Sequence, residues 1–195
     1  MEHPIALYEP GWLSPGAAAE FFAALRAAVA WRQDRIRLFG RSHDLPRLQA
    51  WYGDRGTDYV YSGIPLEPLP WLTPLRELGE RLAATLAQGE GERFNSVLCN
   101  LYRDGRDSNG WHSDDERGLG PEPVVASISL GATRRFRMRP KRGRGEAITL
   151  DLPSGSLLVM GAGAQAHWQH TLAKTARTVG ERINLTYRRV VIGGP

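Results

Sequence analysis

The sequence predicts an α+β fold built on a double-stranded β-helix, or jelly-roll, core with supporting N-terminal helices. Two observations lead to this prediction. Apolar residues repeat twice at helical spacing in the first half of the chain, and short β-prone runs separated by glycine-rich turns follow from Phe94 onward. Because the chain has 195 residues, no internal repeat and no long linker, we expect a single domain over residues 1–195.

Each predicted helix begins at a capping residue followed by proline. Ser14-Pro15 opens the first helix and Thr73-Pro74 the second. Proline suits the first turn because N–H groups there make no hydrogen bond within the helix, so the lack of one costs nothing. The apolar stripes consist of Phe21, Phe22, Leu25 and Val29 in the first helix and Leu75, Leu78, Leu82 and Leu86 in the second. Both stripes are expected to pack against a sheet.

Later runs rich in β-branched and aromatic residues are predicted as strands. They span residues 124–130, 135–139, 148–152, 156–160 and 182–191. Residues 94–191 therefore form the predicted jelly-roll core.

The composition is typical of a soluble intracellular protein, cytoplasmic if the source is bacterial. No apolar run approaches the roughly 20 residues that a membrane-spanning helix needs, and the first residues lack a signal-peptide pattern. The single Cys99 excludes an internal disulfide and lies in an apolar run, as a buried core residue would. We expect a monomer with no membrane partner.

The net charge of +4 comes from a basic set in which Lys141 and Lys174 are the lysines and all other members are arginines. Seven basic residues cluster within eleven positions: Arg134, Arg135, Arg137, Arg139, Lys141, Arg142 and Arg144. Some of them alternate with Phe136 and Met138, as on a strand. Such a ridge fits phosphate contacts with a nucleic acid, and a solvated strand face is the alternative.

His112 and Asp114 have the spacing of two metal ligands on one strand. Residues two apart on a strand project to the same face, so one ion can reach the imidazole and the carboxylate. His170 would complete a set of two histidines and one carboxylate, which leaves open positions and suits non-heme Fe(II) better than structural zinc. His-x-Asp also occurs by chance in surface strands, so the wider context decides.

The segment from Arg182 to Arg188 alternates between polar and apolar residues. Arg182, Asn184, Thr186 and Arg188 share one face of a strand, and the apolar residues between them share the other. A polar face directed into a site is the simplest interpretation, and a solvated edge strand is the alternative.

Over most of its length the chain resembles the AlkB family of Fe(II)/2-oxoglutarate dioxygenases. The resemblance rests on five motifs in the family's order, at residues 95–105, 111–116, 125–131, 167–170 and 182–188. They contain the family pattern of Asn-x-Tyr, His-x-Asp, a distal histidine and Arg-x-Asn-x-Thr-x-Arg. Five ordered motifs are far more specific than any one of them.

The resemblance implies a role for each matching residue. It makes His112, Asp114 and His170 the iron ligands, with His170 chosen over His167, which would then stand beside the substrate or behind the ligands. Arg182 would pair with the far carboxylate of 2-oxoglutarate, because its planar fork matches a carboxylate and keeps its charge. The remaining matching positions surround the cosubstrate in the family: Asn100, Tyr102, Asn184, Thr186 and Arg188.

Residues 36–63 resemble the nucleotide-recognition lid of AlkB enzymes. Leu38, Phe39 and Gly40, followed by the basic Arg41, match a finger that fills the gap left by a flipped base in members acting on duplex DNA. Tyr59 and Tyr61 would line the pocket for the damaged base, Tyr61 by stacking. Outside the lid, Asp115 and Glu116 would face the substrate and favour a cationic methylated base, although a plain surface turn is the alternative.

The resemblance further implies an oxidative demethylase that reverses N-alkyl damage such as 1-methyladenine and 3-methylcytosine. It would use Fe(II), 2-oxoglutarate and O2 and release formaldehyde, succinate and CO2. The expected partner is alkylated DNA, duplex first and single strands second, with RNA left open. The alternatives are a related oxygenase acting on RNA, a free nucleotide or a protein side chain, and a nucleic-acid-binding module with an inactive metal site.

Overall fold

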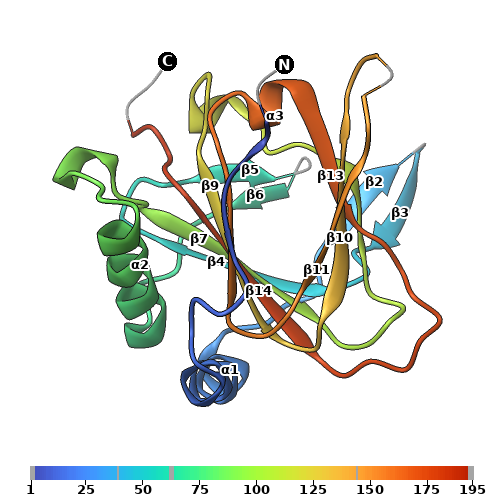
Figure 1. Ribbon diagram of the computed structural model, residues 1–195, viewed down its shortest axis with the longest axis horizontal. Helices are drawn as coiled ribbons and strands as arrows, with labels where there is room; N and C mark the ends of the chain where they lie inside the picture. Colours follow the sequence, from blue (N-terminus) through green and yellow to red (C-terminus); the bar gives the residue numbers. More distant parts are fainter. Residues whose placement is uncertain (1–2, 39, 62–63, 144, 193–195) are drawn as a thin grey trace.

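The computed structural model describes residues 3–38, 40–61, 64–143 and 145–192, with the backbone alone at residues 37–38 and 59–61. Within this part of the chain, two antiparallel sheets lie face to face (Figure 1). The major sheet has the order β1 (Ile5–Glu9), β12 (Ser156–Met160), β9 (Val125–Gly131), β14 (Arg182–Arg188), β7 (Ser96–Tyr102) and β4 (Leu48–Gly53). The minor sheet has the order β11 (Ile148–Leu152), β10 (Arg134–Pro140), β13 (Trp168–Leu172) and β8 (Asn109–His112). The predicted jelly-roll architecture is confirmed.

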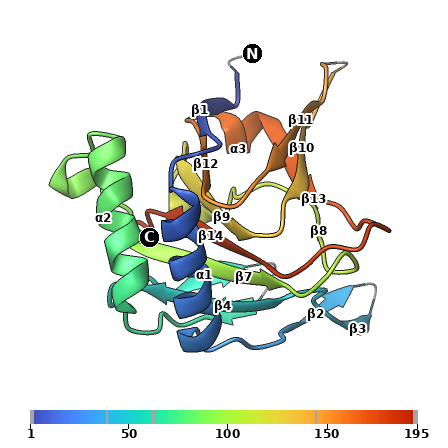
Figure 2. The same ribbon diagram turned by 60° about the horizontal axis from the view of Figure 1, so that its bottom comes forward.

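Two helices cover the outer face of the major sheet, α1 (Pro15–Ala28) and α2 (Thr73–Thr85). Figure 2 shows both on the side of this sheet that faces away from the minor sheet. Ile183, Leu185 and Tyr187 of β14 point toward them and are fully buried, in one cluster with Leu25 of α1 and Leu78 of α2. Burial of each such side chain contributes about 1.5–3 kcal/mol. The helices therefore brace the sheet, as the stripes predict.

The first helix start is confirmed and the second needs a correction. The Ser14 hydroxyl accepts a hydrogen bond from the Ala17 N–H at 3.3 Å, and Pro15 begins α1. In α2 the capping position is Leu72, which provides no side-chain hydrogen bond, and Thr73 is already helical. The prediction that Thr73 caps α2 was wrong, because the chain enters this helix one residue earlier.

The five predicted strands agree with the structure to within one residue, except at the end of the last one. The run predicted over 182–191 stops at Arg188, because the Asn95 side chain replaces the sheet partner of the following backbone. Its Nδ2 donates to the Val190 carbonyl at 2.8 Å, and its Oδ1 accepts from the Val190 N–H at 2.7 Å. The Asn95 side chain thus ends the backbone hydrogen bonding of β14 three residues before the end of the predicted run.

The segment predicted as a lid has two parts. Its outer part forms two small hairpins, β2 (Arg35–Leu38) with β3 (Arg41–Asp44) and β5 (Tyr59–Tyr61) with β6 (Ile64–Leu66). Between them, β4 pairs with β7 and belongs to the major sheet. Figure 1 shows β2 and β3 at the right of the molecule and β5 and β6 above its centre. The division into a lid and a catalytic core stays a prediction.

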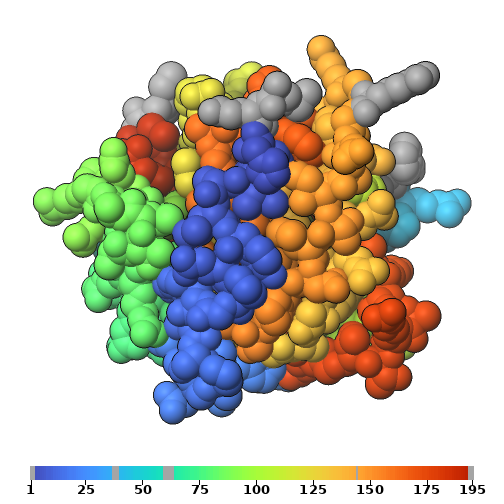
Figure 3. Space-filling view, in the orientation of Figure 1, coloured from blue at the N-terminus to red at the C-terminus, as the bar shows by residue number. Residues whose placement is uncertain are grey.

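Two short 3-10 turns, η1 (Glu90–Glu92) and η2 (Arg117–Leu119), and a short helix, α3 (Ala164–His167), complete the described elements. Figure 3 shows the N-terminal segment lying across the surface between α2 and the strands of the minor sheet. None of the helices in the described ranges is long and apolar enough to cross a membrane.

Candidate metal centre and anion pocket

The predicted ligands His112, Asp114 and His170 lie together between the two sheets. β8 and β13 pair so that His112 is directly opposite His170, and Asp114 follows β8 by two residues. Nε2 of His112 lies 3.9 Å from Asp114 Oδ1, and Nε2 of His170 lies 3.9 Å from Oδ2. One potential ligand atom from each of the three residues can be chosen so that all three atoms lie within 4.8 Å of one another. One ion could contact all three on one side.

The protonation states of these side chains suit a metal. Burial alone would raise the pKa of Asp114, but the charge of Arg188 and electrostatic interactions with the two histidines lower it to about 2. Burial lowers the pKa of His170 to about 3 and also lowers that of His112. An ionised carboxylate and neutral imidazoles are the forms that bind Fe(II).

A buried polar atom without a partner supports the same interpretation. Asp114 is 1% exposed, and its Oδ2 has no hydrogen-bond partner among the described residues. A carboxylate oxygen kept from water in this way is costly unless a cation meets it. The donor set and this oxygen therefore fit an Fe(II) ion.

Neighbouring groups hold the ligands in place. The guanidinium of Arg188 donates to Asp114 Oδ1 at 2.8 Å, and the backbone N–H of Asp114 donates to the side chain of Gln165 at 2.9 Å. Nδ1 of His112 lies 2.8 Å from the Gly110 carbonyl, which requires a proton on Nδ1 and leaves the lone pair on Nε2. This Nε2 accepts a hydrogen bond from Nδ2 of Asn109 at 3.2 Å and lies 3.9 Å from Asp114 Oδ1.

Arg182 lines the same cavity and is 1% exposed. Its Nη2 donates to Ser129 Oγ at 2.8 Å and to Asn184 Oδ1 at 2.6 Å, whereas its Nε has no partner in the described part of the chain. Burial lowers its pKa to about 10, so it stays charged at neutral pH. No acidic side chain of the described residues pairs with it. A buried arginine in this state calls for an anion.

The remaining predicted cosubstrate residues line the wall between Arg182 and the metal centre. Asn184 accepts from Ser127 Oγ at 3.1 Å and donates to Thr186 Oγ1 at 2.8 Å, and Tyr102 places its ring 5.4 Å from the Arg182 guanidinium. Asn100 accepts from Arg47 Nε at 2.9 Å. The polar face of β14 points inward, as its alternation predicts.

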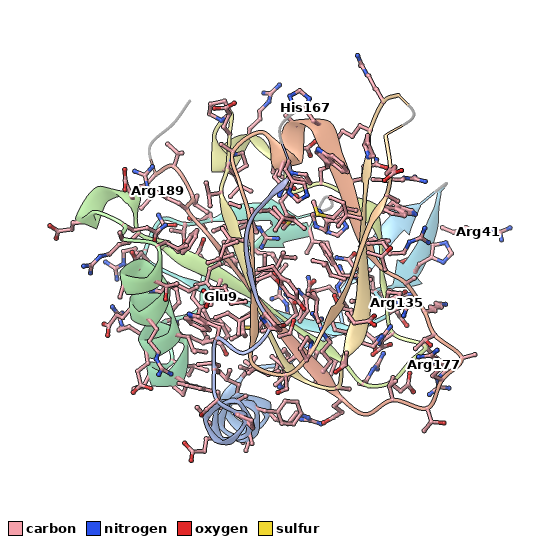
Figure 4. All side chains as sticks on the ribbon, viewed as in Figure 1. Glu9, Arg41, Arg135, His167, Arg177 and Arg189 are labelled. Carbon is pink, nitrogen blue, oxygen red and sulfur yellow. The ribbon has the colours of Figure 1, made fainter. Side chains whose placement is uncertain are left out.

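The predicted substrate residues are less fully placed. Phe39 lies outside the described residues, as do the side chains of Leu38, Tyr59 and Tyr61, whose backbones belong to β2 and β5. Gly40, between β2 and β3, has a φ of +77°, a left-handed conformation that favours glycine. Arg41 is exposed and extends from β3 into solvent (Figure 4).

The acidic pair and the second histidine also have defined positions. Asp115 binds Lys141, with 2.7 Å between Oδ2 and Nζ, and Glu116 is half-buried at the start of η2. His167 is exposed on α3 at the edge of the molecule (Figure 4). His170, rather than His167, is the histidine that faces Asp114.

The predicted basic ridge needs a correction at Arg134. This residue is 3% exposed, and its guanidinium donates to the carbonyls of Asp104, Asp107 and Ala173 at 2.8–3.0 Å. It shares the inward face of β10 with Phe136 and Met138, so it cannot contribute to an exposed ridge. Arg144 lies outside the described residues.

Sequence reasoning missed several residues that shape the cavity. Arg47, which lies in the predicted lid segment and was given no role, is 3% exposed and binds Asn100. Ser129 and Gln165 are buried and contact Arg182 and the Asp114 backbone. Ser129 alternates with buried apolar residues along β9, which was a usable signal, whereas Arg47 and Gln165 have no local pattern.

Comparison with known proteins agrees with this geometry. The model of the 2OG-Fe(II) oxygenase superfamily matches residues 6–188. The chain is 42% identical over 164 residues to mouse DNA oxidative demethylase ALKBH2, covering 80% of this chain and 67% of the mouse protein. It is 40% identical over 195 residues to human alpha-ketoglutarate-dependent dioxygenase alkB homolog 3, and the match covers 95% of this chain and 66% of the human protein. It spans 62% of the length of human ALKBH2, to which it is 39% identical.

Solved structures agree at the level of the fold. OsALKBH1 matches with a TM-score of 0.65 at 17% identity, over 97% of this chain and 98% of that one. A 2OG-Fe(II) oxygenase family oxidoreductase from Burkholderia pseudomallei matches with a TM-score of 0.61 at 18% identity, over 93% and 83%. With the metal centre, the arginine pocket and the superfamily match in agreement, the chain belongs to the AlkB family of 2OG-Fe(II) oxygenases, which use Fe(II) and 2-oxoglutarate.

Proposed function

We propose that the protein is an oxidative demethylase that removes N-alkyl groups from DNA bases, with 1-methyladenine and 3-methylcytosine as substrates. Duplex DNA is the proposed target and single-stranded DNA the second. About 40% identity to proteins named DNA oxidative demethylase supports the reaction class and the DNA target. The match of the finger motif at residues 38–40 supports the duplex.

The observation that carries the enzymatic part of the proposal is the buried charge of Arg182. A module that only binds nucleic acid has no use for a desolvated arginine that lacks an acidic partner among the described residues. Nor does it need that arginine in one cavity with Asp114, whose Oδ2 has no hydrogen-bond partner there. A dicarboxylate cosubstrate would supply one carboxylate to Arg182 and, at its other end, metal ligands. Arg182 and the three potential metal ligands line one cavity, so a single small molecule could contact both.

The residues of this chain would divide the work as follows. His112, Asp114 and His170 hold Fe(II), Arg182 holds the far carboxylate of 2-oxoglutarate, and Arg188 keeps Asp114 ionised and oriented. When bound, Fe(II) and 2-oxoglutarate would supply, with O2, the oxidation that hydroxylates the N-methyl carbon, with release of succinate and CO2; the hydroxymethyl group would then leave as formaldehyde. The apolar side chains of Leu98, Phe136 and Met160, which line the cavity, keep water away from the reacting carbon.

Asp115 is the proposed selector for cationic damage. Its carboxylate lies next in the chain to Asp114 and is 56% exposed, so a methylated base that carries a positive charge could replace Lys141 as its partner. A normal neutral base would gain less from the same exchange. The preference for 1-methyladenine and 3-methylcytosine would follow from this difference.

The experiment that tests the proposal is anaerobic reconstitution with Fe(II) and 2-oxoglutarate, followed by air and oligonucleotides that carry either lesion. DNA single strands, DNA duplexes and RNA of the same sequence are compared, and the mass of the base is followed. We expect the wild type to remove one methyl from the base and the His112→Ala variant to remove none. Succinate formation with an intact methyl on every nucleic acid would move the search to another substrate. No 2-oxoglutarate turnover at all would favour a binding module with an inactive site.

A further inference from the structure

The outer face of the minor sheet carries a row of arginines next to a tryptophan. Arg135, Arg137 and Arg139 project outward from β10 and are exposed, whereas Phe136 and Met138 between them point into the core. Both long helices lie on the far side of the molecule, against the major sheet (Figure 1). The row therefore faces solvent.

The three arginines differ in how their charges are compensated. Arg135 forms two hydrogen bonds with the Asp151 carboxylate of β11, at 3.0 and 3.3 Å. Arg137 and Arg139 have no acidic partner among the described residues. Their guanidinium carbons lie 5.9 and 4.2 Å from the ring centre of Trp111, and Arg139 also donates to Gln169 at 3.3 Å. Two positive charges held against a half-buried indole thus remain available to an anion.

This cluster adjoins the metal centre. Trp111 directly precedes His112 on β8, so its indole lies on the outer side of the strand whose inner side carries the ligand. Lys141, just after β10, binds Asp115, which follows the ligand Asp114. The row of positive charges therefore leads from the sheet surface to the side chains beside the metal centre. Alternate residues on a strand are about 6.6 Å apart, comparable to the separation of successive phosphates in an extended strand.

We propose that Arg137, Arg139 and Trp111 bind the sugar-phosphate backbone of the substrate strand outside the metal centre. This inference rests on the proposed function in one respect, that the substrate is a polynucleotide. The arginines would contact phosphates, and Trp111 would keep the two guanidinium groups positioned and offer its face to a sugar or an unstacked base. The surface would add affinity for long substrates without touching the reacting base.

The test compares the double variant Arg137→Gln/Arg139→Gln with Arg135→Gln, which removes a charge of the same type from the same face but one already paired with Asp151. Binding of unmodified, fluorescently labelled oligonucleotides to the full chain is measured by anisotropy over a salt titration. Single-stranded DNA, duplex DNA and RNA are the three arms. Thermal melting checks that each variant is folded, and Arg137→Lys/Arg139→Lys tests whether charge alone restores binding.

The double glutamine variant should bind about three- to tenfold more weakly in at least one arm, and the arm with the largest loss identifies the polynucleotide. Its salt slope should fall by about 0.7 per arginine on single strands or about 0.9 on duplexes. The lysine variant should retain most of the slope, and Arg135→Gln should behave as the wild type. Equal losses for Arg135→Gln and the double variant, or no loss in any arm, would overturn the proposal.

A second readout separates this inference from the proposed function. On a methylated trinucleotide, too short to reach the outer face, the double variant should demethylate at the wild-type rate, whereas kcat/KM on a long substrate falls. If the wild type demethylates nothing, the proposed function fails, and the anisotropy comparison still decides the surface. If demethylation of the trinucleotide falls as much as that of the long substrate, the arginines act on the metal centre and the surface proposal is wrong.

Discussion

Replacing Arg182 by methionine should remove 2-oxoglutarate binding while leaving the apoprotein nearly as stable as the wild type. Arg182 is 1% exposed, and no acidic side chain of the described residues pairs with it. Methionine has a similar length and no charge. The variant thus separates the cost of burying the guanidinium from its use in binding an anion.

The expected magnitude follows from the surroundings of the guanidinium. Burial lowers the pKa of Arg182 to about 10, and each pKa unit corresponds to about 1.4 kcal/mol, so keeping this charge inside costs the free protein about 3 kcal/mol. The hydrogen bonds to Ser129 and Asn184 contribute about 1.5 kcal/mol or more each in the opposite direction. The two effects nearly cancel, and the free energy of unfolding should change by no more than about 1 kcal/mol.

The assay combines denaturant unfolding of the apoprotein with calorimetric titration of 2-oxoglutarate into protein loaded with Mn²⁺. The affinity for 2-oxoglutarate should fall about a hundredfold or more, since a charge-assisted pair is lost. Arg134→Met is the matched control. Arg134 is also buried, at 3% exposed, but it donates to three backbone carbonyls, so its loss should cost about 3 kcal/mol or more of stability. A loss of that size in Arg182→Met, with 2-oxoglutarate binding intact, would refute the reasoning.

Three further predictions concern metal, pH and substrate. Mn²⁺ at about one hundred times its Kd should raise the Tm by about 5–10 °C, and His112→Ala should abolish this shift; an equal shift in the variant would place the ion elsewhere. Burial alone would raise the pKa of Asp107, but hydrogen bonds from Arg103 lower it. The stabilisation by this pair is therefore complete above about pH 4 and is lost as the pH falls further. At pH 7 the free energy of unfolding of Asp107→Asn should be about 1–3 kcal/mol below that of the wild type, and this difference should become smaller in acid. A difference that stays constant with pH would contradict the prediction. Phe39→Ala should weaken demethylation of duplexes and spare single strands, and equal loss on both would count against a finger at this position.

The sequence alone determined most of the metal centre and much of the architecture. The alternation along β14 correctly separates its polar inner face from Ile183, Leu185 and Tyr187, because side-chain direction along a strand is a local property of the backbone. The same property, together with the ordered motifs, selects His112, Asp114 and His170. It also places the five predicted strands, which correspond to β9, β10, β11, β12 and β14, within one residue, apart from the end of β14.

Only the tertiary structure decided which partner each side chain meets. Periodicity shows that Arg134 and Arg135 point to opposite faces of β10, but not that one is buried among three carbonyls and the other paired with Asp151. The same holds for Arg188 on Asp114 and for Lys141 on Asp115, which join residues far apart in the chain. Such contacts depend on the pairing and packing of distant strands, and no local spacing encodes them.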